Sequence, residues 1–128
     1  MQVTTGIDII EVNRIQEAIE KLGTTFLEKI YTEAEIAYCN RSQGNMAYQH
    51  FAGRFAAKEA VFKAISTYVQ NSQDTMWKTI EIVDNPQGKP AVNVDKLRKI
   101  GLTTLQNIDI SISHIKEYAV ASVVAVFE

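Results

Sequence analysis

The sequence has little cysteine and no excess of charge of either sign, and both features limit what it can be. Cys39 is the only cysteine among 128 residues, so no disulfide can form within the chain. A single thiol suits a reducing compartment, and we expect Cys39 to be a packing residue because its segment offers no base to activate it. The formal net charge is only -2, so no general electrostatic attraction draws the chain to nucleic acid or acidic membranes.

Long apolar runs are also missing. The longest run, from Tyr118 to Phe127, is interrupted by Ser122 and is far shorter than the ~20 residues of a membrane-spanning helix. The first five residues lack the basic and apolar regions of a signal peptide. We therefore expect a soluble cytoplasmic protein with no membrane and no nucleic-acid partner. The length, with 46% hydrophobic residues, predicts a single domain over residues 1–128.

One strand and three helices are predicted for the first third of the chain. Residues 2–10 are rich in β-branched types and predict a strand that ends near Asp8. Apolar residues from Ile15 to Leu22 repeat at helical spacing, and Gly23 supplies a C-terminal stop. Asp8 should therefore lie at a strand-to-helix junction. Two short helices should follow, because two pairs fit the capping box: Thr25 with Glu28, and Thr32 with Glu35.

A long helix is predicted at the centre of the sequence. Asn45 is its expected N-cap, and the helical pattern runs to about Tyr68. Phenylalanines form an apolar stripe along it, and alanines at every fourth position are small enough to let another backbone approach closely. Charged residues crowd an adjoining strip at i, i+4 spacing: Arg54, Lys58, Glu59 and Lys63.

The second half of the chain predicts mainly strands. Residues 79–83 alternate as a half-buried strand does, and the turn at 85–90 leads to a short strand at 91–94, which together predict a hairpin. A short helix is expected at 95–101, and residues 108–113 alternate again. The final apolar run should be a strand covered on both faces. Because helices precede strands, the pattern indicates an α+β fold.

Three residues allow both a functional and a structural interpretation. A carboxylate at a strand end can offer a hard oxygen ligand to Mg²⁺, but a helix cap also explains Asp8. Glu59, flanked by lysines, could hold a metal while ammonium groups meet phosphate, but an ion-pair ladder on a solvated face explains the same charges. His114 shares the parity of the isoleucines in its strand, which also fits a histidine tucked against the core. We expect His50 to be structural.

Several segments, taken together in their order along the chain, resemble a known protein family, although no single segment is specific enough to do so. In sequence they are Gly6-Ile7-Asp8 through Arg14-Ile15, the block from Phe51 to Ala60 with Lys63-Ala64, Gly88-Lys89-Pro90, and Ser111 to His114 with Glu117-Tyr118-Ala119. Together they resemble the small bacterial holo-acyl-carrier-protein synthases, a type of phosphopantetheinyl transferase. The resemblance extends from Gly6 to about Val126, and its most specific part is the RFAAKEA block.

The resemblance implies a fold, a reaction and a set of site residues. The fold would be that of a 4'-phosphopantetheinyl transferase, a small antiparallel sheet packed with one long and several short helices. The reaction would be the Mg²⁺-dependent transfer of 4'-phosphopantetheine from coenzyme A to apo acyl carrier protein, as used in fatty acid biosynthesis. Asp8 and Glu59 would bind the metal, and Lys63 would join them in catalysis. Coenzyme A would contact Arg54, Phe55, Lys58, Lys63, Gly88, Lys89, Pro90, Ser113 and His114.

The resemblance also implies partners and a mechanism. Arg14, Lys21 and Phe26 would dock the carrier protein, and the active form would be a homotrimer with each site between two subunits. A serine hydroxyl of the carrier would attack the β-phosphorus of coenzyme A, with Glu59 as the proton acceptor, directly or through a water. Adenosine 3',5'-bisphosphate would leave.

Two segments depart from the family pattern. Residues 66–68 stand where the family has a glycine-containing loop, so the path of this loop beside the cofactor is open. Glu17 and Glu20 lie among the basic residues of the docking helix and should weaken electrostatic steering of the carrier.

Two other functions also fit parts of the pattern. A ribonuclease H-like nuclease also opens with a strand bearing Gly-Ile-Asp, but such sites usually gather three or four carboxylates and bind polyanions. A non-catalytic trimeric binding module would have no chemical reason to retain the charges of Asp8, Glu59 and Lys63 together.

Overall fold

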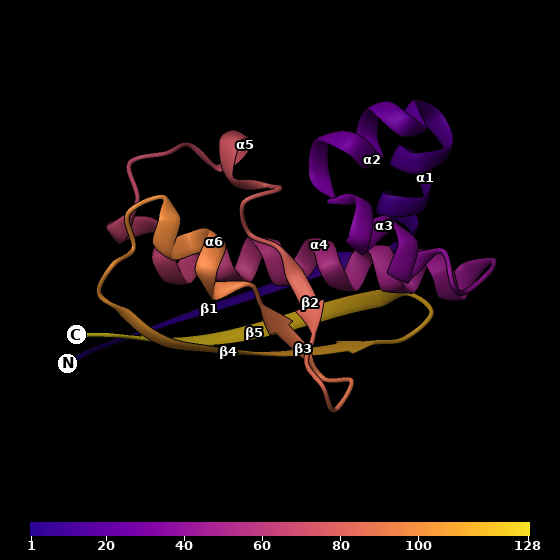
Figure 1. Ribbon diagram of the computed structural model, residues 1–128. Coiled ribbons are helices and arrows are strands. Elements are labelled where there is room, and N and C mark those ends of the chain that lie inside the picture. The colour runs from indigo at the N-terminus through magenta and orange to yellow at the C-terminus, as the bar shows by residue number, and fades with distance from the viewer.

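The computed structural model describes all 128 residues and has an α+β architecture. Its elements are, in chain order, β1 (Gln2–Glu11), α1 (Val12–Leu22), α2 (Thr24–Ile30), α3 (Glu33–Cys39), α4 (Asn45–Ile65), a 3-10 turn η1 (Ser66–Tyr68), α5 (Gln73–Met76), β2 (Ile82–Asp84), β3 (Pro90–Val92), α6 (Val94–Lys99), β4 (Leu105–His114) and β5 (Tyr118–Phe127). Three long strands form an antiparallel sheet in the order β1-β5-β4, and β2 and β3 form a separate hairpin. Helix α4 lies along one face of the long sheet (Figure 1).

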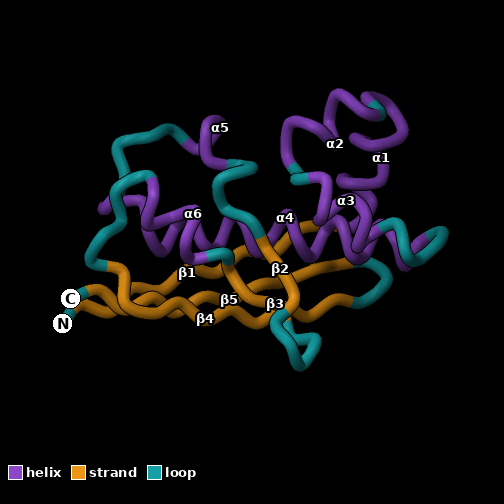
Figure 2. The backbone as a smooth tube through the Cα atoms, in the orientation of Figure 1, coloured by secondary structure: helices purple, strands orange, loops and turns teal.

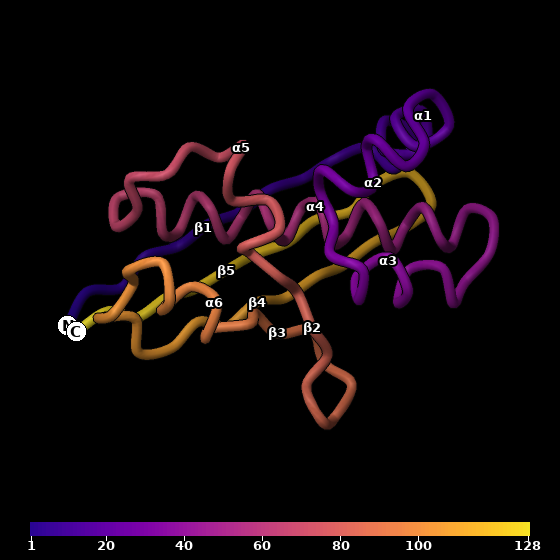
Figure 3. Tube along the Cα trace, turned by 45° about the horizontal axis from the view of Figure 1, so that its top comes forward, coloured from indigo at the N-terminus to yellow at the C-terminus, as the bar shows by residue number.

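The short elements cover the other side of α4 in two groups. Helices α1 to α3 lie over its N-terminal half, and α5 and α6 lie over its C-terminal half (Figures 1 and 2). The β2-β3 hairpin runs past the sheet edge near β4, so that its turn projects beyond the layers. Both chain ends meet at one end of the sheet, where Gln2 pairs with Phe127 (Figure 3). None of the helices combines the length and apolar character needed to cross a membrane.

The contact between α4 and the sheet depends on small residues. Ala56, Ala60 and Ala64 of α4 are at most 1% exposed, and they face β1 and β5. Gly6 of β1 lies against this row, and a Cβ there would come within 1.9 Å of the Ala60 carbonyl oxygen. Only glycine therefore allows β1 and α4 to lie this close. The close approach also determines how near Asp8, two residues further along β1, comes to α4.

Burial divides the interior into two clusters. The larger lies between α4, the sheet and α6, and the smaller joins α1 to α3 with the N-terminal half of α4. Cys39 belongs to the smaller cluster and is fully buried, and this burial raises the pKa of its thiol to about 12. A thiol that stays protonated is a poor nucleophile, which confirms Cys39 as a packing residue.

The helix starts show where local sequence patterns succeed and fail. The capping box at Thr32 is present, because the Glu35 amide donates to Thr32 Oγ1 over 3.2 Å and the Thr32 amide donates to Glu35 Oε1 over 2.8 Å. The expected box at Thr25 is absent, because α2 already starts at Thr24 and has no side-chain cap. Asn45 is also not an N-cap. Gly44 takes that position with a φ of 60°, so Asn45 is the first residue inside α4.

Two strand predictions also need correction. Strand β1 continues to Glu11, so Asp8 lies within the strand and not at its end. Strand β5 is covered on one face only, by α4. Every second residue from Ala119 to Phe127 is buried, whereas Val124 on the other face is 47% exposed. The other face of the sheet is therefore open within a single chain, and it carries apolar side chains on β1 and β5 beside polar ones on β4.

Candidate functional site

The first group of predicted residues gathers between β1 and α4. Asp8 lies on β1, and Glu59 lies on α4 near enough for the charge of Asp8 to raise the pKa of Glu59. Lys63, one helical turn after Glu59, reaches across to the strand. Its ammonium donates to the Ile7 carbonyl oxygen over 2.9 Å and lies 3.4 Å from Asp8 Oδ1. The structure therefore brings together the three residues expected in catalysis.

The electrostatics of this group favour a cation. Burial raises the pKa of Asp8, and Lys63 only partly opposes the rise. Burial and then Asp8 raise the pKa of Glu59, against the hydrogen bond from Gln73 and the charge of Lys63. A raised pKa for a carboxyl means that its negative charge is poorly compensated. The pair thus holds more negative charge than one ammonium neutralises.

The donor set fits Mg²⁺ better than the site of a nuclease. No third acidic, histidine or cysteine side chain joins Asp8 and Glu59 into a larger ligand cluster. Mg²⁺ commonly takes one or two carboxylates from the protein and completes its octahedron with substrate phosphates and water. A nuclease of the ribonuclease H-like type would need further carboxylates at this position, and none is there.

A pocket on the other side of α4 gathers a second group of predicted residues. Arg54 forms part of its floor, is only 3% exposed, and stacks its guanidinium 4.1 Å from the centre of the Tyr38 ring. Arg54 Nη2 lies 3.3 Å from Asp84 Oδ1, whereas its buried Nε has no hydrogen-bond partner. The pocket is lined by Tyr38, His50, Gly53, Arg54, Pro90, Ile112 and His114.

Two histidines form one wall of this pocket. The rings of His50 and His114 lie 5.4 Å apart, and the His50 ring is also 5.4 Å from that of Tyr38. Nδ1 of His114 is 2.7 Å from Gln49 Oε1, so His114 is held in place by α4. Burial, and then the charge of His114, lowers the pKa of His50. His50 precedes Arg54 by four residues on a helix, and this spacing could have revealed it as a pocket residue.

The remaining residues expected near coenzyme A have different positions. Gly88 and Lys89 lie in the turn of the β2-β3 hairpin, where Lys89 pairs with the exposed Asp109 over 3.2 Å. Phe55 stacks on Trp77, with ring centres 5.0 Å apart. Ser113 is exposed on the opposite side of β4 from His114 and is not in the pocket, because side chains alternate along a strand.

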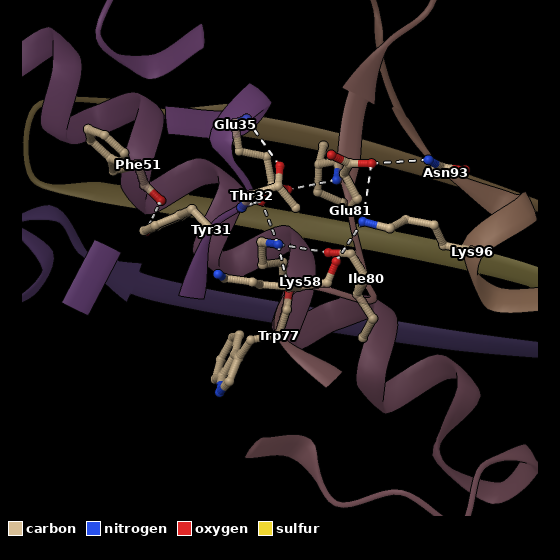
Figure 4. A network of polar contacts seen from close by, with 12 residues as sticks. Tyr31, Thr32, Glu35, Phe51, Lys58, Trp77, Ile80, Glu81, Asn93 and Lys96 are labelled. Atoms are coloured by element: carbon tan, nitrogen blue, oxygen red, sulfur yellow. Dashed lines mark hydrogen bonds and ion pairs between the residues drawn. The ribbon is translucent and has the colours of Figure 1, made fainter. Parts of the chain in front are cut away.

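Lys58 is the clear correction among the predicted site residues. Its side chain is fully buried, and its ammonium donates to Glu35 over 2.7 Å, to the Trp77 carbonyl over 2.6 Å and to the Ile80 carbonyl over 2.8 Å (Figure 4). An ammonium has three N–H donors, and all three are used here. The structure therefore does not bring Lys58 to the site, and no donor is left for a phosphate.

The two groups lie at opposite edges of the sheet. Asp8 is on the edge strand β1, His114 is on the edge strand β4, and β5 separates them. Helix α4 contributes to both, with Glu59 on one side and Arg54 on the other. Within one chain the predicted residues thus form two half-sites and not one continuous site.

The residues expected to dock the carrier protein lie on the first two helices. Arg14 and Lys21 are exposed on α1. Phe26 of α2 is partly buried, and its ring packs edge-on against Tyr31 with centres 6.2 Å apart.

Comparison with known proteins gives one consistent result. The family model of the 4'-phosphopantetheinyl transferase superfamily matches residues 4–123. A holo-[acyl-carrier-protein] synthase of Koribacter versatilis is 44% identical over 97% of this chain and 98% of its own, and one of Protochlamydia amoebophila is 45% identical over 94% and 95%.

Solved structures agree with the sequence relatives. The fold is similar to that of a holo-(acyl-carrier-protein) synthase from Bacillus anthracis in complex with CoA (3',5'-ADP), with a TM-score of 0.74 and 37% identity over 95% of this chain and 94% of that one. It is also similar to a Chronobacterium ammoniagenes ACPS–CoA complex, with a TM-score of 0.82 and 25% identity over 100% and 99% of the two chains.

Proposed function

The chain belongs to the 4'-phosphopantetheinyl transferase superfamily, and we propose that it acts as a holo-[acyl-carrier-protein] synthase. It transfers the 4'-phosphopantetheine group of coenzyme A to a serine of apo acyl carrier protein and releases adenosine 3',5'-bisphosphate. The observation that carries the proposal is the cluster of Asp8, Glu59 and Lys63, which suits a metal-assisted phosphoryl transfer. The proposed compartment is the cytoplasm, which a lone buried thiol suits, and the proposed pathway is fatty acid biosynthesis.

Mg²⁺ is the proposed cofactor, held by Asp8 and Glu59. When bound, the ion supplies positive charge to the phosphate oxygens of coenzyme A. The chain's own contribution beside it is Lys63, whose half-exposed ammonium uses only part of its donors on Ile7 and Asp8. A remaining N–H can meet the phosphoryl oxygens, on which negative charge develops during transfer.

Glu59 is the proposed proton acceptor. The carrier serine oxygen forms a bond to the β-phosphorus of coenzyme A while the bond from that phosphorus to the bridging oxygen breaks. The bridging oxygen leaves with adenosine 3',5'-bisphosphate, and the serine proton passes to the Glu59 carboxylate. Burial and Asp8 raise the pKa of Glu59 in the free protein, and a bound Mg²⁺ would lower it again, so the proton is proposed to pass to Glu59 directly or through a water.

The coenzyme A site is proposed to form between two copies of the chain. One copy contributes Asp8, Glu59 and Lys63, and its neighbour contributes the Arg54 and His114 pocket with the Gly88-Lys89-Pro90 turn. This pairing accounts for the position of the two half-sites at opposite sheet edges. The assembly we propose is a homotrimer.

The open face of the sheet supports such an assembly. Its exposed apolar side chains include Val3 at 53%, Ile7 and Ile9 at 64%, and Val124 at 47%. Exposed apolar side chains gathered on neighbouring strands in this way often mark an interface. We expect Val124→Lys to reduce the mass measured by light scattering from three chains to one, and to lower transfer activity with it. Ile100→Lys is the control, because Ile100 is 38% exposed at the end of α6, outside the three-stranded sheet, and it should keep both properties. A wild-type mass of one chain would contradict the assembly.

The proposed function is tested by measuring the mass of the acyl carrier protein after the reaction. The protein is incubated with apo acyl carrier protein, coenzyme A and Mg²⁺, and the carrier is then analysed by mass spectrometry. We expect one phosphopantetheine adduct per carrier, and we expect excess EDTA to abolish it. No adduct would refute the transferase function, and an adduct insensitive to EDTA would refute the role of the metal. Plasmid DNA treated in parallel should remain uncut.

Arg14 on α1 should affect the carrier protein and not the nucleotide. Arg14 is exposed, and reversing its charge should slow association with an acidic carrier. We expect Arg14→Glu to lower kcat/KM for the carrier by about tenfold while the KM for coenzyme A is unchanged. Lys99→Glu makes the same charge change on α6 and serves as the control. Equal loss for both substrates would instead indicate misfolding of the Arg14 variant.

A further inference from the structure

One side chain outside the predicted set donates a hydrogen bond to Glu59. Gln73, the first residue of α5, donates from Nε2 to Glu59 Oε1 over 2.6 Å, and the bond is partly buried. It is the only side-chain hydrogen bond to Glu59. Lys63, by contrast, reaches the backbone at Ile7 and the carboxylate of Asp8.

The segment that presents Gln73 is held at both ends. At its start, Tyr68 stacks on Phe127 with ring centres 3.7 Å apart and planes 3° apart. At its end, Met76 is 1% exposed and Trp77 is 8% exposed. Between these anchors Thr75 Oγ1 donates to the Ser72 carbonyl oxygen over 2.8 Å. The amide of Gln73 therefore comes from a segment whose two ends are packed into the core.

A carboxylate that binds a metal needs a fixed orientation. With Oε1 occupied by the Gln73 amide, Glu59 keeps Oε2 free of any hydrogen bond from the chain. Groups that hydrogen-bond to metal ligands orient them, and their loss typically weakens metal binding by about 10- to 100-fold. We propose that Gln73 is a positioning residue that orients Glu59 for the divalent metal. This inference rests on the proposed function, because it requires Glu59 to be a metal ligand.

The turn just before the segment of Gln73 departs from the family pattern. Residues 66–68 form a 3-10 turn where the glycine-containing loop was expected, and Tyr68 anchors that turn on the last strand.

Metal binding can be measured without turnover. Gln73→Met keeps the length of the side chain but removes its donor, and Gln70→Met makes the same change at an exposed position of the same segment. Mn²⁺ is titrated into each variant with saturating coenzyme A, and the free Mn²⁺ is followed by electron paramagnetic resonance. We expect Gln73→Met to raise the Kd for Mn²⁺ about tenfold, and Gln70→Met to match the wild type.

A second comparison separates orientation of Glu59 from general loosening of the loop. In a Glu59→Gln background, Gln73→Met should cause no further change in Mn²⁺ affinity, because the two residues act as a unit. A further loss there would show that Gln73 acts by another route and would overturn the inference.

The remaining outcomes are also distinguishable. If wild-type protein and Glu59→Gln bind Mn²⁺ equally, the proposed metal site fails before Gln73 is tested. If wild-type protein binds Mn²⁺ through Glu59 and Gln73→Met is within twofold of it, the positioning role is wrong. Tighter binding by Gln73→Met would mean that the amide competes with the metal, which also overturns the inference. Equal unfolding midpoints of the two methionine variants would exclude a difference in folding.

Discussion

Glu59→Gln is expected to lower the rate of phosphopantetheine transfer by about 10³-fold at saturating Mg²⁺, within the range that loss of a general base produces. The amide keeps the shape of the side chain and can still accept the hydrogen bond from Gln73. It removes the charge that would hold the metal and the group that would take the serine proton. Both losses act on the same transition state, so the decrease should appear in kcat and not only in the KM for coenzyme A.

The fold should not suffer from this change. Because burial and Asp8 raise the pKa of Glu59 above its unfolded value, its ionised form opposes folding at neutral pH, and a neutral amide removes that opposition. We therefore expect the free energy of unfolding to stay equal or rise when no metal is present. The matched control is Glu33→Gln, an exposed position on α3 that should retain wild-type rates. Near-native transfer by Glu59→Gln would remove Glu59 from the mechanism.

Lys58→Met is expected to lower the free energy of unfolding by about 3–5 kcal/mol, the usual cost of removing one partner from a buried ion pair. The change leaves the Glu35 carboxylate, which is fully buried, without its counter-charge. It also leaves the carbonyls of Trp77 and Ile80 without a donor. Glu35 is bound in turn by the amides of Thr32 and Ile82, so the defect would reach both α3 and β2 (Figure 4).

Urea unfolding at one fixed protein concentration measures this loss. Lys99→Met, at an exposed position of α6, should change stability by less than about 0.5 kcal/mol. The double variant Lys58→Met with Glu35→Gln should recover part of the loss, because no unpaired charge is then buried. In the folded fraction, the KM for coenzyme A should stay within a few-fold of the wild type. A stable Lys58→Met protein with a greatly raised KM would restore the phosphate-binding role that the resemblance implied.

Lys63 and Lys58 lie on the same helix but have different surroundings. Lys63 extends toward β1, where its ammonium joins the carboxylate group, whereas Lys58 extends toward α3 and β2. Helix α4 therefore carries both the charges proposed for catalysis and the buried ion pair that attaches it to α3 and β2. This explains why a charged strip lies on an otherwise core-facing helix.

Local sequence was enough to predict most of the elements. Alternation and helical spacing located the long central helix, the hairpin and the last two strands, because each pattern reflects which face of an element is buried. The errors in the predicted elements concern where helices and strands begin and end. Thr25 was a wrong helix cap and Asn45 was another, because Gly23 and Gly44 turn the chain before those residues with positive φ values.

The sequence by itself determined the family and predicted Asp8, Glu59 and Lys63 as site residues, because the order and spacing of its charged segments are specific. Tertiary structure decided which of those charges are available to a substrate. Successive helix residues point about 100° apart, so Lys58 and Glu59 are neighbours in sequence but face different parts of the protein. Only the packing of α3 and β2 against α4 buries the first and leaves the second partly open. Packing also created a contact that no sequence pattern predicted, the hydrogen bond from Gln73 to Glu59.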